Sequence, residues 1–247
     1  MVDSRSLSER LSKLPPGRHL IPRDFVSQNQ RERMLLATAE LAAERGYRKT
    51  TIELIAKTAR VALVTFYEHF ANKEECFLAA FDESVAGARE VFAELVDAEQ
   101  PWVDQISIGL EVFLEMVVAE QPRAQLCIVE SQAAGGAALA RYQAMLASVA
   151  PKLREGRELN PRASRLPEGL ETALAGGLMW LVHQRLIAGR VGDLKGLLPE
   201  MLQVTLTPYV GEVEAAGAAE TAQARACLLY TSPSPRDRTR SRMPSSA

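Results

Sequence analysis

The sequence contains very little cysteine. Cys76, Cys127 and Cys227 are the three cysteines among 247 residues, and they are too few and too scattered for a disulfide framework or a zinc site. The three histidines lie far apart in the sequence. No Ser/His/Asp set, paired-histidine metal motif or glycine-rich phosphate loop stands out. The sequence therefore predicts a protein that is not an enzyme and that uses no metal or cofactor.

Long apolar runs are missing as well. No stretch approaches the ~20 apolar residues that a membrane-spanning helix needs, and the N-terminus lacks the apolar core of a signal peptide. No segment shows the sustained alternation of apolar and polar residues that is typical of strands. These absences argue against a membrane protein and predict an all-α, cytoplasmic protein.

The net charge of −2 hides an uneven distribution along the chain. Residues 1–73 contain 13 Lys/Arg and 8 Asp/Glu, a balance of +5, whereas residues 74–226 contain 12 and 22, a balance of −10. A basic N-terminal part on an acidic body fits phosphate binding by the first part alone. An ordinary solvated surface would explain the same charges, so the asymmetry only supports other signals.

The clearest signal lies between Thr50 and Lys73. The threonine pair at 50–51 precedes an apolar helical pattern, which a threonine hydroxyl can cap. Residues 62–67 are long enough for two helical turns, with Phe66 facing inward. Asn72 then begins a further helix with acidic residues in its first turn. Two short helices joined by a tight turn form a helix-turn-helix, whose second helix is sized for the DNA major groove.

The stretch from about Arg31 to Phe81 resembles the DNA-binding domain of the tetracycline-repressor (TetR) family of bacterial transcriptional regulators. The resemblance depends on an ordered set of features: Gly46-Tyr47 at a helix exit, the threonine pair, TFYEHF over 65–70 and Asn-Lys-Glu over 72–74. This combination is far more specific than a helix-turn-helix alone. It implies a three-helix DNA-binding domain over residues 28–76, followed by a helical effector-binding and dimerisation domain over residues 77–226.

The turn of the motif departs from the family pattern. The family usually has Ala-Gly-Val-Ser, whereas residues 59–62 read Ala-Arg-Val-Ala. Arg60 would cost roughly 1 kcal/mol if the backbone keeps a positive φ angle. Ala62 lacks a capping hydroxyl, a loss of about 0.5–2 kcal/mol. Val64 stands where the family often has glycine, so an alternative interpretation is a helical ligand- or partner-binding protein that has lost specific DNA recognition.

The resemblance also implies roles for individual residues. The start of the second helix supplies side chains for base edges, and hydroxyl, phenol, imidazole and ammonium groups contact phosphates. The implied DNA-binding residues are Thr51, Ala62, Leu63, Val64, Thr65, Tyr67, His69 and Lys73. The implied function is a ligand-responsive homodimeric repressor that binds a palindromic double-stranded DNA operator, with half-sites ~34 Å apart.

Further helices are predicted along the rest of the chain. Their expected ranges are 29–45, 73–98, 101–121, 122–134, 137–158 with a kink or restart at Pro151, 168–188 and 194–210. The resemblance implies that the last two pair with their copies in a second subunit, and ordinary intramolecular core is the alternative. Glycines at 176 and 177 would allow close helix approach.

The middle helices, about residues 77–185, would then hold an effector. A largely apolar effector is favoured because basic residues are sparse between 74 and 150. The candidate contacts are Phe81, Phe92, Trp102, Phe113, Met116, Tyr142, Met145, Trp180 and His183. Most large apolar residues at helical spacing are simply core, which is the competing explanation for each of them.

The two ends of the sequence stand apart from these domains. Residues 1–27 are polar and proline-rich, which predicts a flexible arm whose basic side chains reach phosphates or have no role. Residues 227–247 change abruptly to Ser, Pro and Arg. Back-translated, their start resembles a sequencing-library adapter read in frame. We therefore interpret 227–247 as an adapter read-through tail, so that the natural C-terminus is missing or altered beyond about Ala226.

Overall fold

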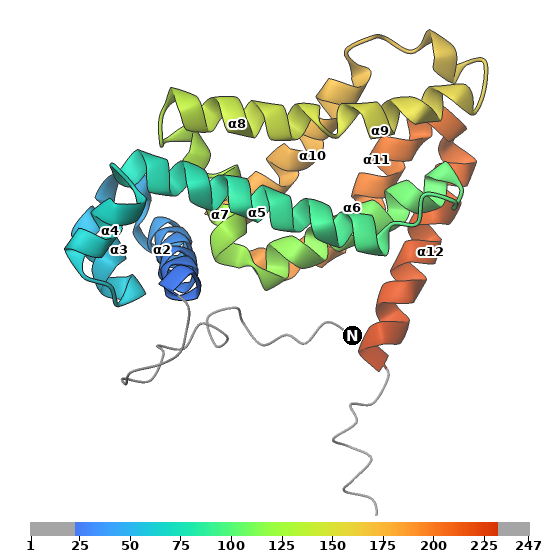
Figure 1. The fold of residues 1–247 in the computed structure, drawn as a ribbon. Coiled ribbons are helices and arrows are strands. Elements are labelled where there is room, and N and C mark those ends of the chain that lie inside the picture. The colour runs from blue at the N-terminus through green and yellow to red at the C-terminus, as the bar shows by residue number, and fades with distance from the viewer. Residues whose placement is uncertain (1–22, 232–247) are drawn as a thin grey trace, which may run out of the picture.

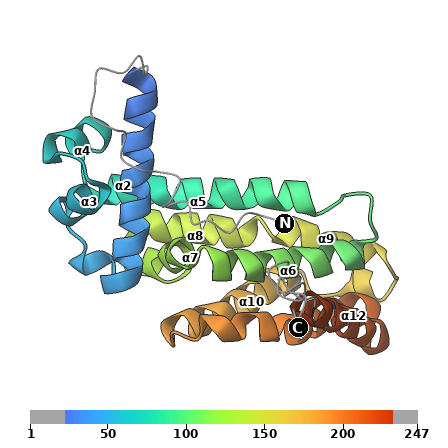
Figure 2. The same ribbon diagram turned by 90° about the horizontal axis from the view of Figure 1, so that it is seen from below.

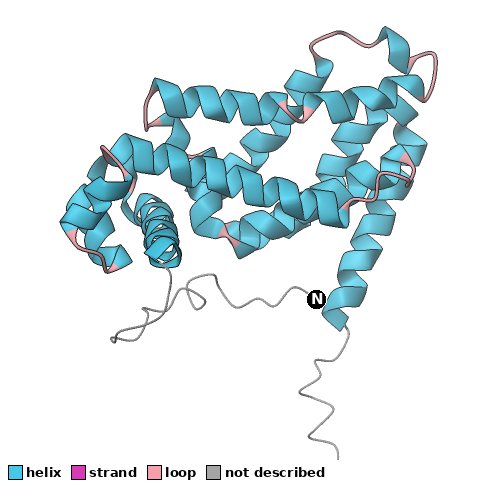
Figure 3. Ribbon diagram, viewed as in Figure 1, coloured by secondary structure: helices cyan, strands magenta, loops and turns pink. Residues whose placement is uncertain are grey.

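The computed structural model describes residues 23–231, with side chains for residues 24–225. Helices and short loops make up this part of the chain, which contains no strand (Figures 1 and 3), so the predicted all-α fold is confirmed. In chain order the helices are α2 (Arg23–Arg45), η1 (Tyr47–Lys49), α3 (Ile52–Ala59), α4 (Leu63–His69), α5 (Lys73–Leu95), α6 (Trp102–Ala119), α7 (Gln121–Ile128), η2 (Glu130–Gln132), α8 (Gly136–Ala147), α9 (Ala150–Arg154), η3 (Glu155–Glu158), η4 (Ala163–Arg165), α10 (Leu170–Ile187), η5 (Val191–Leu197), α11 (Leu198–Val210) and α12 (Glu212–Thr231).

A small head sits at one end of an elongated body. The helices α2, α3 and α4 form the head, and α5 leaves it and runs along the body beside α6 and α8 (Figures 1 and 2). The C-terminal helices α11 and α12 pack on each other and lie at the end of the body away from α3 and α4. The helix-turn-helix is therefore at one tip of the molecule.

Local capping explains where the helices of the head begin. The Thr51 hydroxyl accepts a hydrogen bond from the amide of Leu54 at the start of α3, and Asn72 accepts one from the amide of Glu75 at the start of α5. Each bond satisfies one of the amides that a helix start leaves free. Both capping predictions are thus confirmed.

One continuous core joins head and body. Met34 and Phe66 of the head and Phe77 of α5 are fully buried, and Leu126 of α7 belongs to the same cluster. The helix α7 packs against both α2 and α5. The head is therefore attached to the body through α7 as well as through the covalent continuation into α5.

Trp102 anchors the end of the body away from the head. Its indole N–H donates to the Lys152 carbonyl at 2.8 Å, and its ring lies edge-on to that of Tyr209 with centroids 5.0 Å apart. Gly156 lies against both rings, because a Cβ at this position would come within 2.6 Å of the Trp102 ring. Only glycine fits here without displacing an aromatic ring.

A buried ion pair fastens the loop region after α9 to α10. The Arg157 guanidinium donates to both carboxylate oxygens of Glu171, at 2.6 and 3.0 Å, and Tyr209 donates its hydroxyl hydrogen to the same carboxylate at 3.2 Å. Glu171 is fully buried. The hydrogen bond from Arg157 holds the pKa of Glu171 below its ordinary value. The buried charge is thus paired, as burial of a carboxylate requires.

Several helix boundaries differ from the predicted ones. The first described helix begins at Arg23 instead of Asn29, so residues 23–27, which we expected in a flexible arm, are helical. The predicted helix 137–158 is divided into α8, α9 and η3, with the expected restart at Pro151. The predicted helix 194–210 begins with the 3-10 turn η5, because Pro199 lies in the first turn of α11 and cannot continue a preceding helix.

The helix α12 was not predicted at all. Residues 212–226 are rich in alanine, which has the highest helix propensity, but lack a regular apolar stripe. The helix forms because of this alanine propensity and because it packs on α11, although the sequence has no apolar periodicity that would predict it. Its last residues, 227–231, belong to the predicted adapter tail, and the remainder of that tail lies outside the described residues.

Within residues 23–231, no helix has both the length and the apolar character that crossing a membrane requires.

Candidate functional site

The outer face of α4 is apolar and exposed. Leu63, Val64 and Tyr67 have 43%, 66% and 54% of their surfaces exposed, whereas Phe66 on the opposite face is fully buried. A helix of seven residues can hold this arrangement because side chains three or four positions apart share a face. The predicted inward and outward faces of α4 are therefore confirmed, although Thr65 is half-buried.

The turn before α4 keeps the backbone that glycine would favour. Arg60 has φ 56° and ψ 44° and lies in the left-handed region; it is the only residue other than glycine with a positive φ in the described chain. Ala62 occupies the N-cap of α4 and, as predicted, makes no side-chain capping bond there. The turn thus keeps a left-handed residue and an uncapped helix start, as predicted for Arg60 and Ala62.

Two arginines come close together beside this turn, a feature that sequence reasoning missed. Burial and the nearby charge of Arg60 both lower the pKa of Arg33. The Nε and Nη1 atoms of Arg33 are buried and have no hydrogen-bond partner within the described residues. The two positive charges add to the basic character of the head. The separation of 27 positions in sequence gave no signal for this pair.

The residues predicted to contact phosphates have different environments. Thr51 is exposed at the N-terminus of α3, a position where backbone amides favour anions. The His69 ring is half-buried against Phe70, with the two centroids 6.2 Å apart. Tyr67 points its ring away from the core. These three side chains and the exposed face of α4 lie on the same helix-turn-helix unit.

Lys73 has an additional structural role. Its ammonium group donates to the carbonyls of Tyr47 and Thr50, at 3.0 and 2.9 Å, and lies 4.1 Å from the centre of the Tyr47 ring. Burial lowers the pKa of Lys73. A lysine with two backbone partners and an aromatic neighbour keeps a fixed position, so it fastens the segment before α3.

The predicted effector residues come from α5, α6, α8 and α10. Of these helices, α5 packs against α6 and α8, and α8 packs against α10. Phe81 and Trp102 are buried; Phe92, Phe113, Met116, Tyr142, Met145 and His183 are half-buried; Trp180 is exposed. Their assignment to an effector stays a prediction.

The two titratable members of this set lie in low-polarity surroundings. Burial raises the pKa of Tyr142 and lowers the pKa of His183, so both side chains are neutral at pH 7. The His183 ring stacks on Trp180 with centroids 5.6 Å apart. Its Nδ1 atom is buried without a hydrogen-bond partner among the described residues. A ligand that contacts either side chain meets a neutral group.

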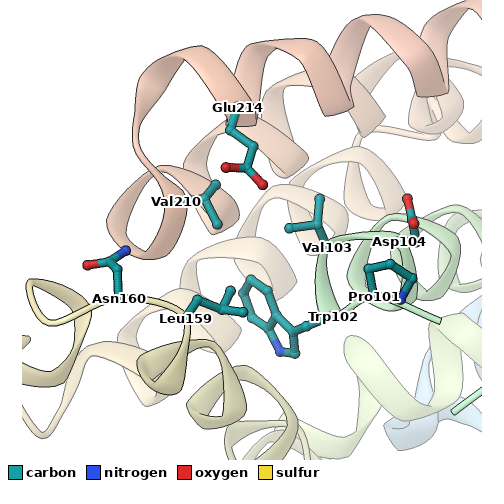
Figure 4. Close-up of a pocket in the computed structure, with 8 residues that line it drawn as sticks. All are labelled: Pro101, Trp102, Val103, Asp104, Leu159, Asn160, Val210 and Glu214. Atoms are coloured by element: carbon teal, nitrogen blue, oxygen red, sulfur yellow. The ribbon is translucent and has the colours of Figure 1, made fainter. Parts of the chain in front are cut away.

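A cavity of about 560 Å³ opens at the other end of the body (Figure 4). Trp102 is the one predicted effector residue that lines it. The complete lining is Pro101, Trp102, Val103, Asp104, Leu159, Asn160, Val210 and Glu214. Glu214 points from α12 toward Val103, and Asp104 lies at the edge (Figure 4). Asn160 is already bonded to the Tyr209 carbonyl and to two loop amides, so a ligand here would meet apolar walls and two carboxylates.

Comparison with known proteins gives a family and several relatives. Residues 34–80 match the model of bacterial regulatory proteins of the tetR family. The transcriptional activator FasR from Mycolicibacterium smegmatis is 30% identical over 105 residues, which are 40% of this chain and 48% of FasR. The transcriptional regulator TcmR from Streptomyces glaucescens is 41% identical over 64 residues, 25% of this chain and 28% of TcmR. The chain thus spans about half or less of these relatives.

A solved structure extends the likeness to the body. FadR from Bacillus subtilis, solved in complex with stearoyl-CoA, superposes with a TM-score of 0.59 at 21% identity and covers 73% of this chain and 98% of its own. At that identity the likeness establishes the fold alone. The matched residues 34–80 are the ones that build the C-terminal half of α2, the helix-turn-helix and the start of α5. Residues 34–80 therefore match the domain that the tetR family of bacterial regulatory proteins shares, and the likeness of the remaining helices is one of fold.

Proposed function

We propose that the protein is a DNA-binding transcriptional regulator, a ligand-responsive homodimeric repressor of a palindromic operator. The outer face of α4 carries this proposal: Leu63, Val64 and Tyr67 are exposed at one tip of the molecule, while Phe66 fixes the helix from behind. Exposed apolar side chains on a short helix suit the major groove, where they contact thymine methyl groups.

The surroundings of α4 suit the phosphate backbone. The Tyr67 hydroxyl, the Thr51 hydroxyl and the start of α3 offer hydrogen-bond donors to phosphate oxygens. The close pair Arg33 and Arg60 adds positive charge. His69 and Lys73 complete the set, and Lys73 contributes mainly its charge because its ammonium group already has backbone partners. Phosphate contacts fix the register, and α4 reads the bases.

An exposed stripe on α10 supports dimerisation. Ala173, Gly177, Trp180 and Ile187 are exposed at helical spacing, and Trp180 and Ile187 show 59% and 57% of their surfaces. Val204 on the adjacent α11 is half exposed. Small and large apolar residues together form a self-complementary surface that a twofold contact buries. Two heads on a twofold axis then address two half-sites ~34 Å apart.

The effector is proposed to bind among α5, α6, α8 and α10. The half-buried apolar residues of these helices and the neutral Tyr142 and His183 favour a largely apolar ligand. The complex of FadR with stearoyl-CoA supplies a first ligand class to test, long-chain acyl compounds. An effector acts only by binding one arrangement of the two heads better than the other.

Selection from random duplex DNA tests the proposal. The protein is ended at Ala226, its mass in solution is measured, and enriched sequences are determined. The expected result is a dimer that enriches a palindrome, after which acyl compounds are screened for release of that palindrome. Because the relative FasR is an activator, a promoter-reporter assay with the selected operator measures the sign of regulation.

Matched variants separate base reading from backbone contact. Tyr67→Phe removes only the hydroxyl and should weaken all selected sites about tenfold, the range for a lost hydrogen bond to a charged group. Leu63→Ala should relax the preference at one base pair. Leu139→Ala on α8, with similar exposure, serves as the control and should leave both properties unchanged. A folded dimer that enriches no sequence at low salt would contradict the proposal and favour the ligand- or partner-binding alternative.

A further inference from the structure

The segment between α2 and α3 is held by a side chain from the body. Glu130, in the turn η2 that follows α7, accepts a hydrogen bond from the Tyr47 amide at 2.7 Å. The two residues are 83 positions apart in sequence. A carboxylate that accepts from a backbone N–H makes one of the stronger hydrogen bonds of a protein. This bond ties the body directly to the backbone of the head.

The same segment is held from the other side by Lys73. The ammonium group donates to the carbonyls of Tyr47 and Thr50. The hydroxyl of Thr50, which is buried, donates to the Gly46 carbonyl at 3.0 Å. Residues 46–50 therefore have fixed positions set by one acidic and one basic side chain, and the acidic one belongs to the body.

Gly46 supplies the backbone angle that this segment needs. Its φ angle is +84°, which L side chains rarely adopt, whereas a Cβ built there would make only an ordinary contact, 3.6 Å from a Glu130 oxygen. The peptide that follows is thus turned so that the Tyr47 N–H faces Glu130. The Tyr47 ring packs edge-on to the buried Phe77 with centroids 4.9 Å apart, which prevents the segment from rotating as a whole.

The segment ends directly at a DNA-contacting element. Thr50 is followed by Thr51, whose hydroxyl caps α3 and whose exposed position we assign to a phosphate. A shift of the Tyr47 amide therefore moves the start of α3 and, through the turn, α4. Because α7 packs on α2 and α5, the position of Glu130 depends on the packing of the body.

We infer that Glu130 is a positioning residue for DNA binding: its carboxylate fixes the Tyr47 amide and so sets the placement of Thr51 and the helix-turn-helix relative to the body. The inference depends on the proposed DNA-binding function. It describes a contact between head and body that is separate from the covalent path through α5.

The test compares Glu130→Ala and Glu130→Gln with Glu94→Ala, a control that removes an exposed carboxylate from α5. Affinity for the selected palindrome is measured well below each melting temperature. We expect Glu130→Ala to weaken binding about tenfold, Glu130→Gln to weaken it less because its amide oxygen still accepts a hydrogen bond, and Glu94→Ala to bind like the wild type. Hydrogen exchange should speed up at residues 47–50 in Glu130→Ala alone.

A double-mutant cycle distinguishes positioning from general destabilisation. If Glu130 acts through the placement of Thr51, then Glu130→Ala and Thr51→Ala together should weaken binding less than the product of their separate effects. Independent multiplication of the two effects, or wild-type affinity in Glu130→Ala, would overturn the inference. Failure of the wild-type protein to bind any duplex would instead contradict the proposed function, so the two failures have different readouts.

Discussion

At the scale of single residues, the turn before α4 holds a strained backbone conformation. Arg60 adopts φ 56°, where the Cβ of an L-residue crowds its own backbone at a cost of roughly 1–2 kcal/mol. Its amide still donates to Lys57 at 3.1 Å and the next amide to Ala56 at 3.0 Å. The turn therefore persists because its backbone hydrogen bonds and the buried residues around it outweigh the strain of one residue.

Arg60→Gly should therefore stabilise the protein. The left-handed strain is removed, and part of the gain is lost to the greater freedom of glycine in the unfolded chain, which leaves about 0.5–1 kcal/mol. Urea unfolding of both proteins at pH 7 measures the difference. Ala59→Gly, one position earlier inside α3, should have the opposite sign, and a stabilisation in both variants would contradict this explanation.

The Arg157–Glu171 pair should make stability depend on pH in the acid range. The pKa of Glu171 is lowered in the folded protein, chiefly by the hydrogen bond from Arg157. The pair's contribution is complete above the unfolded pKa of about 4.3 and is lost as pH falls through the lower folded value. Melting temperatures between pH 7 and pH 3 should fall less steeply in Glu171→Gln than in the wild type. If the melting temperatures of the two proteins fell equally with pH, the Arg157–Glu171 pair would not be the cause of this pH dependence.

At the scale of helices, α10 has apolar residues on two sides: one side faces the core and the other is exposed. Leu178 and Val182 face the core, while Trp180 and Ile187 face outward on the same helix. An exposed apolar stripe of this kind is typical of an interaction surface. In the proposed dimer, the second chain covers this side of α10.

Trp180→Glu should convert the dimer into a monomer. The variant places a charge at the centre of an apolar contact, where it has no partner. Sedimentation or light scattering of the protein ended at Ala226 measures the mass. Val149→Glu, which replaces an exposed apolar residue at the α8–α9 junction, is the control and should remain dimeric. A dimeric Trp180→Glu would move the interface elsewhere.

Helices and caps were predictable where their causes lie within a few residues. The caps at Thr51 and Asn72, the inward Phe66 and the strained turn all follow from neighbours three or four positions away. The contacts of Glu130 with Tyr47 and of Trp102 with Gly156 join segments that are distant in sequence, and no local sequence pattern indicates these contacts. The helix α12 escaped prediction because it forms from propensity and lacks a periodic apolar face.

At the scale of the whole molecule, the distribution of charge separates the two ends. The first 73 residues carry +5 and residues 74–226 carry −10, so under the proposed function the basic N-terminal part of the sequence attracts DNA while the acidic body repels it. This arrangement orients the approach of the duplex toward the head and makes binding depend on salt. The few charged groups of the head therefore decide the ionic-strength dependence.

Arg60→Gly should reduce that dependence. The variant removes one charge from each head, two from the dimer, and the slope of log K against log salt should become shallower by about 0.9 for each charge that meets a phosphate. The slope is obtained from the affinity for the selected palindrome, measured at salt concentrations between about 50 and 200 mM. Arg190→Ala, in the loop after α10, removes a charge from the body and should leave the slope unchanged.

The two tryptophans of the chain occupy opposite environments, and this makes the protein its own optical reporter. Trp102 packs against Tyr209 and Gly156 with its N–H bonded to a carbonyl, so its emission should be blue-shifted and quenched less by acrylamide than that of Trp180. Trp180 is open to water, so its emission should be red-shifted and readily quenched until a partner subunit covers it. Quenching as a function of protein concentration would then follow assembly, and the remaining protected signal would follow the integrity of the far end of the body, without any added label.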